Sequence, residues 1–262
     1  MATRQWFPEV VAGRLIVLRR HAPENLAAFL RWYADPRIAH LARYQQMPMR
    51  ADEIERFFAA RVIGPDALAM AVHERATDRL VGTCAFSQLD GDNGSALYHI
   101  TIGEPDAWGH GFGTEATRLM LDQAFGAMGL HRIALFVFEF NERAIRAYKR
   151  SGFVVEGRSR ESIWRDGRWW DELAMSILES DWRRMQTGED GVPAQAAGPA
   201  APDVMPGPAL AGGPALAGGP VIPVVSAVPG ADREADREAD HEARRVRIGM
   251  TDEPGRGFWS RR

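Results

Sequence analysis

Apolar side chains follow two different periods along the N-terminal part of the chain. In residues 22–33, 52–62, 113–128 and 142–151 they recur every three or four positions, which predicts four helices. Short apolar or alternating runs predict strands at 14–20, 68–73, 80–89, 95–103, 133–138, 153–158 and 169–178. Strands outnumber helices and the two do not alternate strictly. The fold class is therefore α+β, with helices packed on a sheet.

The periodic pattern ends near residue 186, where the composition changes. Residues 188–230 hold nine prolines and nine glycines, which is typical of a segment that builds no packed core. We expect a folded domain over 1–186 and a disordered linker over 187–230. Residues 231–262 begin with four-residue repeats of the Ala-Asp-Arg-Glu type, so this tail is expected to be disordered or a short helix. Phe258 and Trp259 beside arginines make it a candidate to dock an unidentified protein.

Charge and composition exclude several classes of protein. The chain has 32 lysines and arginines against 35 acids, without the basic surplus of a nucleic-acid-binding protein. Its single cysteine, Cys84, excludes an intramolecular disulfide, and the histidines lack the spacing of metal ligands. No apolar run is long enough for a membrane helix, and charges in the first thirty residues do not fit a signal peptide. We expect a cytoplasmic protein without a metal.

A glycine-rich loop follows the predicted strand 95–103 and leads into a predicted helix. Such a loop lets backbone N–H groups converge on a phosphate at the positive end of the helix. The spacing fits neither a dinucleotide-binding fingerprint nor a P-loop, and by itself it is compatible with a turn that binds nothing. The candidate phosphate-binding residues are Trp108, Gly109, His110, Gly111, Phe112, Gly113 and Thr114.

A second motif lies where the next predicted strand, 133–138, passes into a helix. Asn141 is placed to cap that helix. Ala144 and Tyr148 are four residues apart and share one helical face, and a small residue there leaves room for a slender ligand. Taken alone, Tyr148 is better explained as a packed helix residue than as an acid.

Together the two motifs resemble those of the GNAT acetyltransferase superfamily. The loop from Trp108 to Gly113 is similar to its acyl-CoA loop, (Arg/Gln)-x-x-Gly-x-(Gly/Ala). The second motif is similar to Asn-x-x-Ala-x-x-x-Tyr-x-x-x-Gly-Phe, at Asn141, Ala144, Tyr148, Gly152 and Phe153. The likeness covers about residues 14–182, and residues 105–116 and 166–175 sharpen it toward the RimJ/RimL-like branch, which acetylates ribosomal-protein N-termini.

This resemblance implies a mixed, mostly antiparallel splayed sheet and acetyl-CoA as co-substrate, in a monomer or homodimer. The thioester donor would lie between strands 95–103 and 133–138, with its amides paired to the backbone of Ile100, Thr101 and Ile102. Tyr148 would protonate the leaving thiolate. Trp108 departs from the usual Arg or Gln, so phosphate binding would rest on backbone N–H groups.

The resemblance leaves the general base and the acceptor open. The glutamate often found on the fourth strand of the family would fall at Leu97, which leaves His99 as the candidate base. A packed sheet residue is the better explanation of His99 by itself, and water relays or the absence of a protein base are alternatives. The expected acceptor is a protein N-terminal α-amine. A polyamine or an amino sugar remains an alternative, as does a non-catalytic acyl-CoA-binding regulator. Trp164, Trp169 and Trp170 with Asp171 could hold a cationic amine or simply pack.

Overall fold

The computed structural model describes residues 8–45 and 47–187, and all structural statements concern these residues. Their strands are β1 (Val10–Ala12), β2 (Ile16–Arg20), β3 (Leu68–Glu74), β4 (Leu80–Asp90), β5 (Ser95–Ile102), β6 (Arg132–Phe138), β7 (Val154–Arg165) and β8 (Arg168–Leu178). The helices are α1 (Leu26–Tyr33), α2 (Pro36–Ala42), α3 (Ala51–Phe57), α4 (Phe112–Asp122), α5 (Glu142–Arg150) and α6 (Glu179–Thr187). Short 3₁₀ turns are η2 (Pro23–Asn25) and η4 (Pro105–Ala107), and π-helical turns are η3 (Phe58–Val62) and η5 (Gln123–Ala127).

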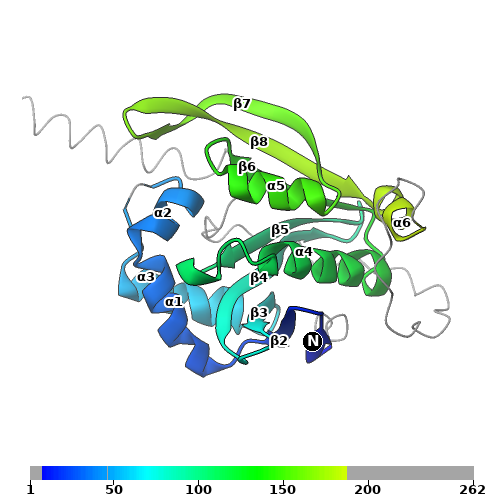
Figure 1. Cartoon of the computed structure of the whole chain (residues 1–262), viewed down its shortest axis with the longest axis horizontal. Coiled ribbons are helices and arrows are strands. Elements are labelled where there is room, and N and C mark those ends of the chain that lie inside the picture. Colours follow the sequence, from blue (N-terminus) through cyan, green and yellow to red (C-terminus); the bar gives the residue numbers. More distant parts are fainter. Residues whose placement is uncertain (1–7, 46, 188–262) are drawn as a thin grey trace, which may run out of the picture. The chain divides into compact units, whose positions relative to one another are not determined.

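The eight strands form one mixed sheet in the order β1-β2-β3-β4-β5-β6-β8-β7 (Figure 1). Every neighbouring pair is antiparallel except β5 and β6, which are parallel and connected through α4. A parallel pair needs such a crossover, because the chain must return to the starting edge. The predicted α+β class with a mostly antiparallel sheet is confirmed.

The sheet splits between its two parallel strands. The β5–β6 pairing covers only Ser95–Leu97 opposite Arg132–Ala134. Beyond it, β5 continues to pair with β4 as far as Ile102, and β6 continues to pair with β8 as far as Phe138. Each strand is therefore held by its outer neighbour while the two inner edges separate, as the predicted splayed sheet requires.

Two apolar cores lie on opposite faces of the sheet. Tyr98 on β5, Met120 on α4 and Tyr148 on α5 belong to the larger core. On the other face, Phe29 of α1 and Phe58 after α3 belong to the smaller core. Because side chains of a strand alternate between faces, Tyr98 and Ile100 face α4, whereas His99 and Thr101 face the α1 side.

The predicted elements are present, but some bounds were wrong and three elements were missed. The strand expected at 153–158 extends to Arg165, and it joins β8 through a two-residue turn in which Asp166 and Gly167 have φ of 50° and 77°. Positive φ at both positions is typical of a type I′ hairpin turn. The missed elements are β1, α2 and α6.

Expectations about the C-terminal part lie almost entirely outside the described residues. This holds for the linker 187–230, apart from Thr187 at the end of α6, and for the tail 231–262. Within 8–45 and 47–187, no helix combines the length and apolar character that a membrane-spanning segment needs. The same residues contain no group of three or more His, Cys, Asp or Glu arranged as metal ligands.

Candidate functional site

A cavity opens where β5 and β6 separate. Its volume is about 930 Å³, including space open to solvent. The lining comes from β5, the glycine loop, α4, α5 and α2. Twelve of the fourteen residues predicted for the site line it, and they are Ile100, Thr101, Ile102, Trp108, Gly109, Gly111, Phe112, Gly113, Thr114, Asn141, Ala144 and Tyr148.

The glycine loop forms one end of this cavity without side chains in the way. Gly109 and Gly111 have φ of 87° and 86°, a left-handed conformation that glycine adopts without strain. Gly111 is the N-cap of α4, so the first N–H groups of the helix are free of intrahelical partners. A Cβ at Gly113 would point toward Ile102 and Ile100, both of which line the cavity. The loop therefore offers backbone donors and bare space to an anion.

Glu115 in the first turn of α4 anchors the start of this helix to the beginning of β2, near one edge of the sheet. Its carboxylate accepts the backbone N–H groups of Arg14 and Leu15, both at 2.7 Å, and of Ile16 at 3.0 Å. These three donors belong to the turn between β1 and β2 and to the first residue of β2. Charge-assisted hydrogen bonds of this kind fix the start of α4 and with it the glycine loop.

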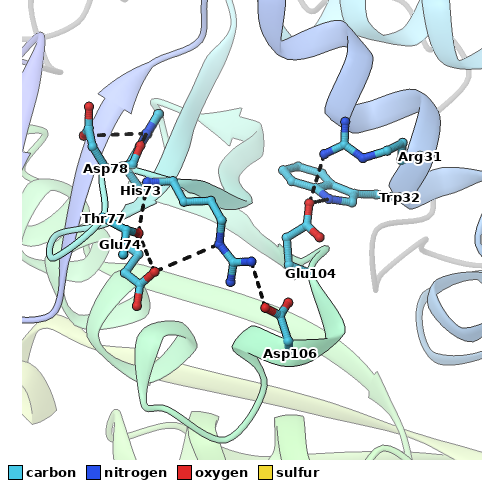
Figure 2. A network of polar contacts seen from close by, with 9 residues as sticks. Arg31, Trp32, His73, Glu74, Thr77, Asp78, Glu104 and Asp106 are labelled. Carbon is cyan, nitrogen blue, oxygen red and sulfur yellow. Dashed lines mark hydrogen bonds and ion pairs between the residues drawn. The ribbon is translucent and has the colours of Figure 1, made fainter.

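The segment between β5 and the loop is tied to α1 and to the β3–β4 turn (Figure 2). Glu104 accepts hydrogen bonds from the indole N–H of Trp32 at 2.9 Å and from Arg31 at 3.0 Å. Asp106 in η4 pairs with Arg79 at 2.7 Å. The chain thus approaches the glycine loop along a fixed path.

Arg143, which the sequence motif did not reveal, packs on Trp108 beside the glycine loop. The Trp108 indole N–H donates to the carbonyl of Ile102 at 2.7 Å, which orients the ring. The Arg143 guanidinium lies 3.9 Å from the centroid of that ring, within the range of a cation–π contact. Burial, and to a smaller extent the nearby Arg146, lower the pKa of Arg143. No carboxylate in the described part of the chain forms an ion pair with Arg143, which lines the cavity.

A second arginine, Arg150, lines the cavity from the other end of α5. It donates to the Thr114 hydroxyl at 3.4 Å, beside the start of α4. Sequence reasoning missed both Arg143 and Arg150. The available signal was their separation of seven positions, because two residues of one helix at that spacing share a face.

The second motif presents its residues to the cavity from the start of α5. Asn141 is the N-cap, accepting from the Ala144 N–H at 3.3 Å, and its amide donates to the carbonyl of Leu41 at 3.3 Å. Tyr148 is 2% exposed, and burial raises the pKa of its phenol well above the ordinary value. The phenol therefore stays protonated and is able to donate a proton over the whole neutral range.

Two predicted residues do not line the cavity. His110 packs against Phe112, with ring centroids 5.8 Å apart. His99 is 7% exposed, faces the α1 side of the sheet, and shares a hydrogen bond with the Ser87 hydroxyl. The structure therefore does not bring His99 and Tyr148 together as lining residues of one cavity.

The aromatic cluster at the β7–β8 hairpin is only partly buried, since Trp164 and Trp169 are 46% and 55% exposed. Trp164 and Trp169 stack edge to face with ring centroids 5.2 Å apart, and the Arg168 guanidinium lies 3.3 Å from the centroid of the Trp170 ring. Asp171 accepts from Arg158 and from the backbone N–H of Glu161. Trp170 and Asp171 are therefore engaged within the fold, whereas Trp164 and Trp169 present half of their surface to solvent.

Comparison with known proteins assigns the family. Residues 15–154 match the acetyltransferase (GNAT) domain. An uncharacterized N-acetyltransferase p20 of Bacillus licheniformis is 25% identical over 177 residues, which span 66% of this chain and 98% of that protein. The spermidine N(1)-acetyltransferase of Vibrio cholerae is 32% identical over 131 residues, 50% of this chain and 75% of that protein.

A solved structure supports the same assignment. The spermidine N-acetyltransferase of Vibrio cholerae, in complex with CoA and spermine, superposes with a TM-score of 0.57 at 25% identity. The alignment covers 64% of this chain and 98% of that one. The relatives carry the names of N-acetyltransferases, which supports an enzyme and not the non-catalytic regulator.

The Glu115 anchor generates a prediction about stability. Glu115→Gln leaves one of the three N–H donors facing an amide NH₂ group, so we expect a loss of about 1–3 kcal/mol in the free energy of unfolding. Urea denaturation followed by circular dichroism measures it. The matched control is Glu142→Gln in the first turn of α5, whose side chain is exposed and pairs only with Arg146. Equal unfolding free energies for the two variants would show that the anchor contributes nothing.

Proposed function

Because this chain belongs to the GNAT family of N-acetyltransferases, we propose that it transfers the acetyl group of acetyl-CoA to the α-amine at the N-terminus of a protein or peptide. The observation that carries the proposal is the cavity between β5 and β6, closed at one end by the bare glycine loop. A slender chain with an anionic end matches that shape.

The residues of the cavity fit the donor. Its diphosphate would accept hydrogen bonds from the N–H groups at the start of α4, where the helix dipole favours negative charge. Arg143 would supply the cation that Trp108 cannot, and Arg150 would add a second one beside Thr114. The β6-facing backbone of β5 beyond Leu97 has no strand partner among the described residues. The Ile102 carbonyl accepts the Trp108 indole N–H, and the remaining groups of Ile100–Ile102 on that edge are available to the amides of the donor.

The reaction then depends mainly on position and on two proton transfers. The amine nitrogen forms a bond to the thioester carbon, the carbon–sulfur bond breaks, and the nitrogen loses one proton. Tyr148 would give a proton to the departing thiolate. His99 remains our candidate for taking the proton of the amine, because it shares the α1-side face of β5 with Thr101, which lines the cavity.

The charge of the segment beside the cavity favours a peptide acceptor over a polyamine. Residues 26–50 contain four arginines, of which Arg31, Arg37 and Arg50 form ion pairs with Glu104, Asp35 and Asp52. Arg43 forms no ion pair among the described residues, and its charge would be unfavourable to a polycationic acceptor. The polyamine alternative rests on the spermidine acetyltransferases among the relatives.

An acceptor panel tests the proposed substrate class. We expect acetyl transfer from acetyl-CoA to peptides with a free N-terminus at a kcat/KM at least tenfold above that for spermidine or spermine, because the charge of Arg43, which no acid pairs among the described residues, disfavours polycations. Release of CoA measures turnover. The same peptides with a blocked N-terminus serve as controls. Acetylation of polyamines alone would overturn the peptide acceptor and establish the alternative.

The Arg143 stack predicts a loss of donor affinity when it is removed. We expect Arg143→Met to weaken acetyl-CoA binding about tenfold, or about 1.4 kcal/mol, because one cation near the diphosphate is lost. Titration calorimetry measures the Kd, and acetyl-pantetheine, which lacks the diphosphate, should bind both proteins equally. The control is Arg146→Met, an exposed arginine of the same helix. An unchanged Kd in Arg143→Met would remove this residue from the donor site.

The raised pKa of Tyr148 predicts how kcat should depend on this phenol and on pH. Tyr148→Phe should lower kcat by about 10²-fold or more while leaving KM for acetyl-CoA unchanged, since the phenol acts on the leaving thiolate. As the folded-state pKa is raised, the wild-type phenol stays protonated, so kcat should show no loss from its ionisation below pH 10. If His99 takes the proton of the amine, kcat/KM of the wild-type protein should fall at acidic pH, where a histidine base is protonated. The His99→Gln variant should lack this fall in the same assay. Wild-type kcat in Tyr148→Phe would exclude the acid role.

A further inference from the structure

Buried polar atoms from three residues, without hydrogen-bond partners in the described part of the chain, meet on the α1 side of the cavity. They are the Tyr33 hydroxyl, the Thr101 hydroxyl, and the Nε and Nη1 atoms of Arg43. The third guanidinium nitrogen of Arg43, Nη2, donates to the side-chain carbonyl of Gln45 at 3.5 Å. Leaving a buried polar group unpaired costs about 1–3 kcal/mol, and more for a charged group. Native proteins keep few such groups, and each one calls for a physical reason.

The three groups are neighbours, and one of them lines the cavity. Burial raises the pKa of the Tyr33 phenol, while the nearby Thr101 hydroxyl and Arg43 guanidinium oppose that change. Thr101 lines the cavity, as do Leu41 and Ala42, which precede Arg43 at the end of α2. The cluster therefore lies next to the opening between β5 and β6, on the face opposite α4.

The backbone that carries Arg43 is held from two sides. The Arg43 N–H closes α2 on the carbonyl of Ala39 at 3.0 Å. Arg165 at the end of β7 donates to the carbonyl of Arg43, to that of Tyr44 at 3.1 Å and to that of Gln45 at 3.3 Å. The base of the Arg43 side chain is therefore fixed next to Leu41 and Ala42, which line the cavity.

The carboxylates near Arg43 accept hydrogen bonds from other donors, although the charge of Glu53 partly offsets the effect of burial, which lowers the pKa of Arg43. Glu53 accepts the backbone N–H of Arg50 at 3.1 Å at the start of α3. Glu172 accepts the Tyr44 hydroxyl. Among the described residues, neither acid forms an ion pair with Arg43. A guanidinium presents a planar fork of N–H donors that matches the two oxygens of a carboxylate.

We propose that Arg43, together with the hydroxyls of Tyr33 and Thr101, binds a carboxylate of the acceptor, so that the enzyme prefers amines that carry a carboxylate close to the nitrogen. This inference rests on the proposed acetyl transfer and names its substrate class. The carboxylate reaches the cluster from the cavity beside Thr101, and the long Arg43 side chain turns toward it. Two sources share this chemistry: the acidic side chain of an N-terminal Asp or Glu, and the α-carboxylate of a free amino acid.

Matched acceptors test the proposal. One arm compares peptides that begin with Asp or Asn, and another compares amino acids with their amides, each with saturating acetyl-CoA. We expect kcat/KM to be at least tenfold higher for the carboxylate member of one pair, and the pair that shows the preference identifies the source. Equal rates for both members of both pairs in the wild-type protein would overturn the proposal.

Variants of Arg43 show whether this residue causes the preference. Arg43→Met should abolish the preference by lowering kcat/KM for the carboxylate acceptors at least tenfold more than for the matched carboxamides, and Arg43→Lys should restore part of it. The control Arg37→Met, on the same helix and paired with Asp35, should retain it. Retention of the preference in Arg43→Met would overturn the proposal.

Two further measurements distinguish a binding role of Arg43 from a purely structural one. Since the Met variant removes an unpaired buried cation, we expect its Tm to equal or exceed that of wild type, whereas a purely structural role would lower it. Calorimetry with acetyl-CoA reports on the donor site independently. Donor binding and transfer without any carboxylate preference would refute only this inference. Absence of transfer to every amine would refute the proposed function as well.

Discussion

The separation of β5 from β6 is the constraint on which the rest of the structure depends. Their pairing stops after Leu97 and Ala134, yet each strand remains bonded to an outer neighbour beyond that point. The opening is therefore maintained by regular strand pairing on both sides of it. Because α4 connects the two strands, its N-terminus and the glycine loop lie at one end of the opening, and α5 follows β6 along its side.

Charge is distributed unevenly around this opening, and the distribution divides it into two regions. Arg143 and Arg150 lie with the helix N-terminus on the α4 side, where a phosphate-bearing donor would be neutralised. On the other face Arg43 lies beside Tyr33 and Thr101, with two guanidinium nitrogens that have no partner in residues 8–45 and 47–187. Both regions are suited to anions, which is consistent with an acidic acceptor and unfavourable for a polycation.

Most of the sheet could be predicted from the sequence, and the exceptions have identifiable causes. The seven residues of α2 are too few to show a helical period, and they begin at Pro36 after the Asp35 cap. The strand β7 was predicted too short because it lies at the edge of the sheet and its exposed residues do not alternate. Helix α6 packs on the core only through Trp182 and Met185, too few apolar residues to show a period.

The sequence alone determined the parts of the site that depend on local geometry: a loop of glycines before a helix, and Asn141, Ala144 and Tyr148 on one helical turn after another. These residues meet in one cavity because backbone conformation and helical spacing are local properties. Tertiary structure alone decided that Arg143 stacks on Trp108, that His99 faces away from α4, and that Arg43 meets Tyr33 and Thr101. Such contacts join residues distant in the chain, and only the packing of helices against strands sets their partners.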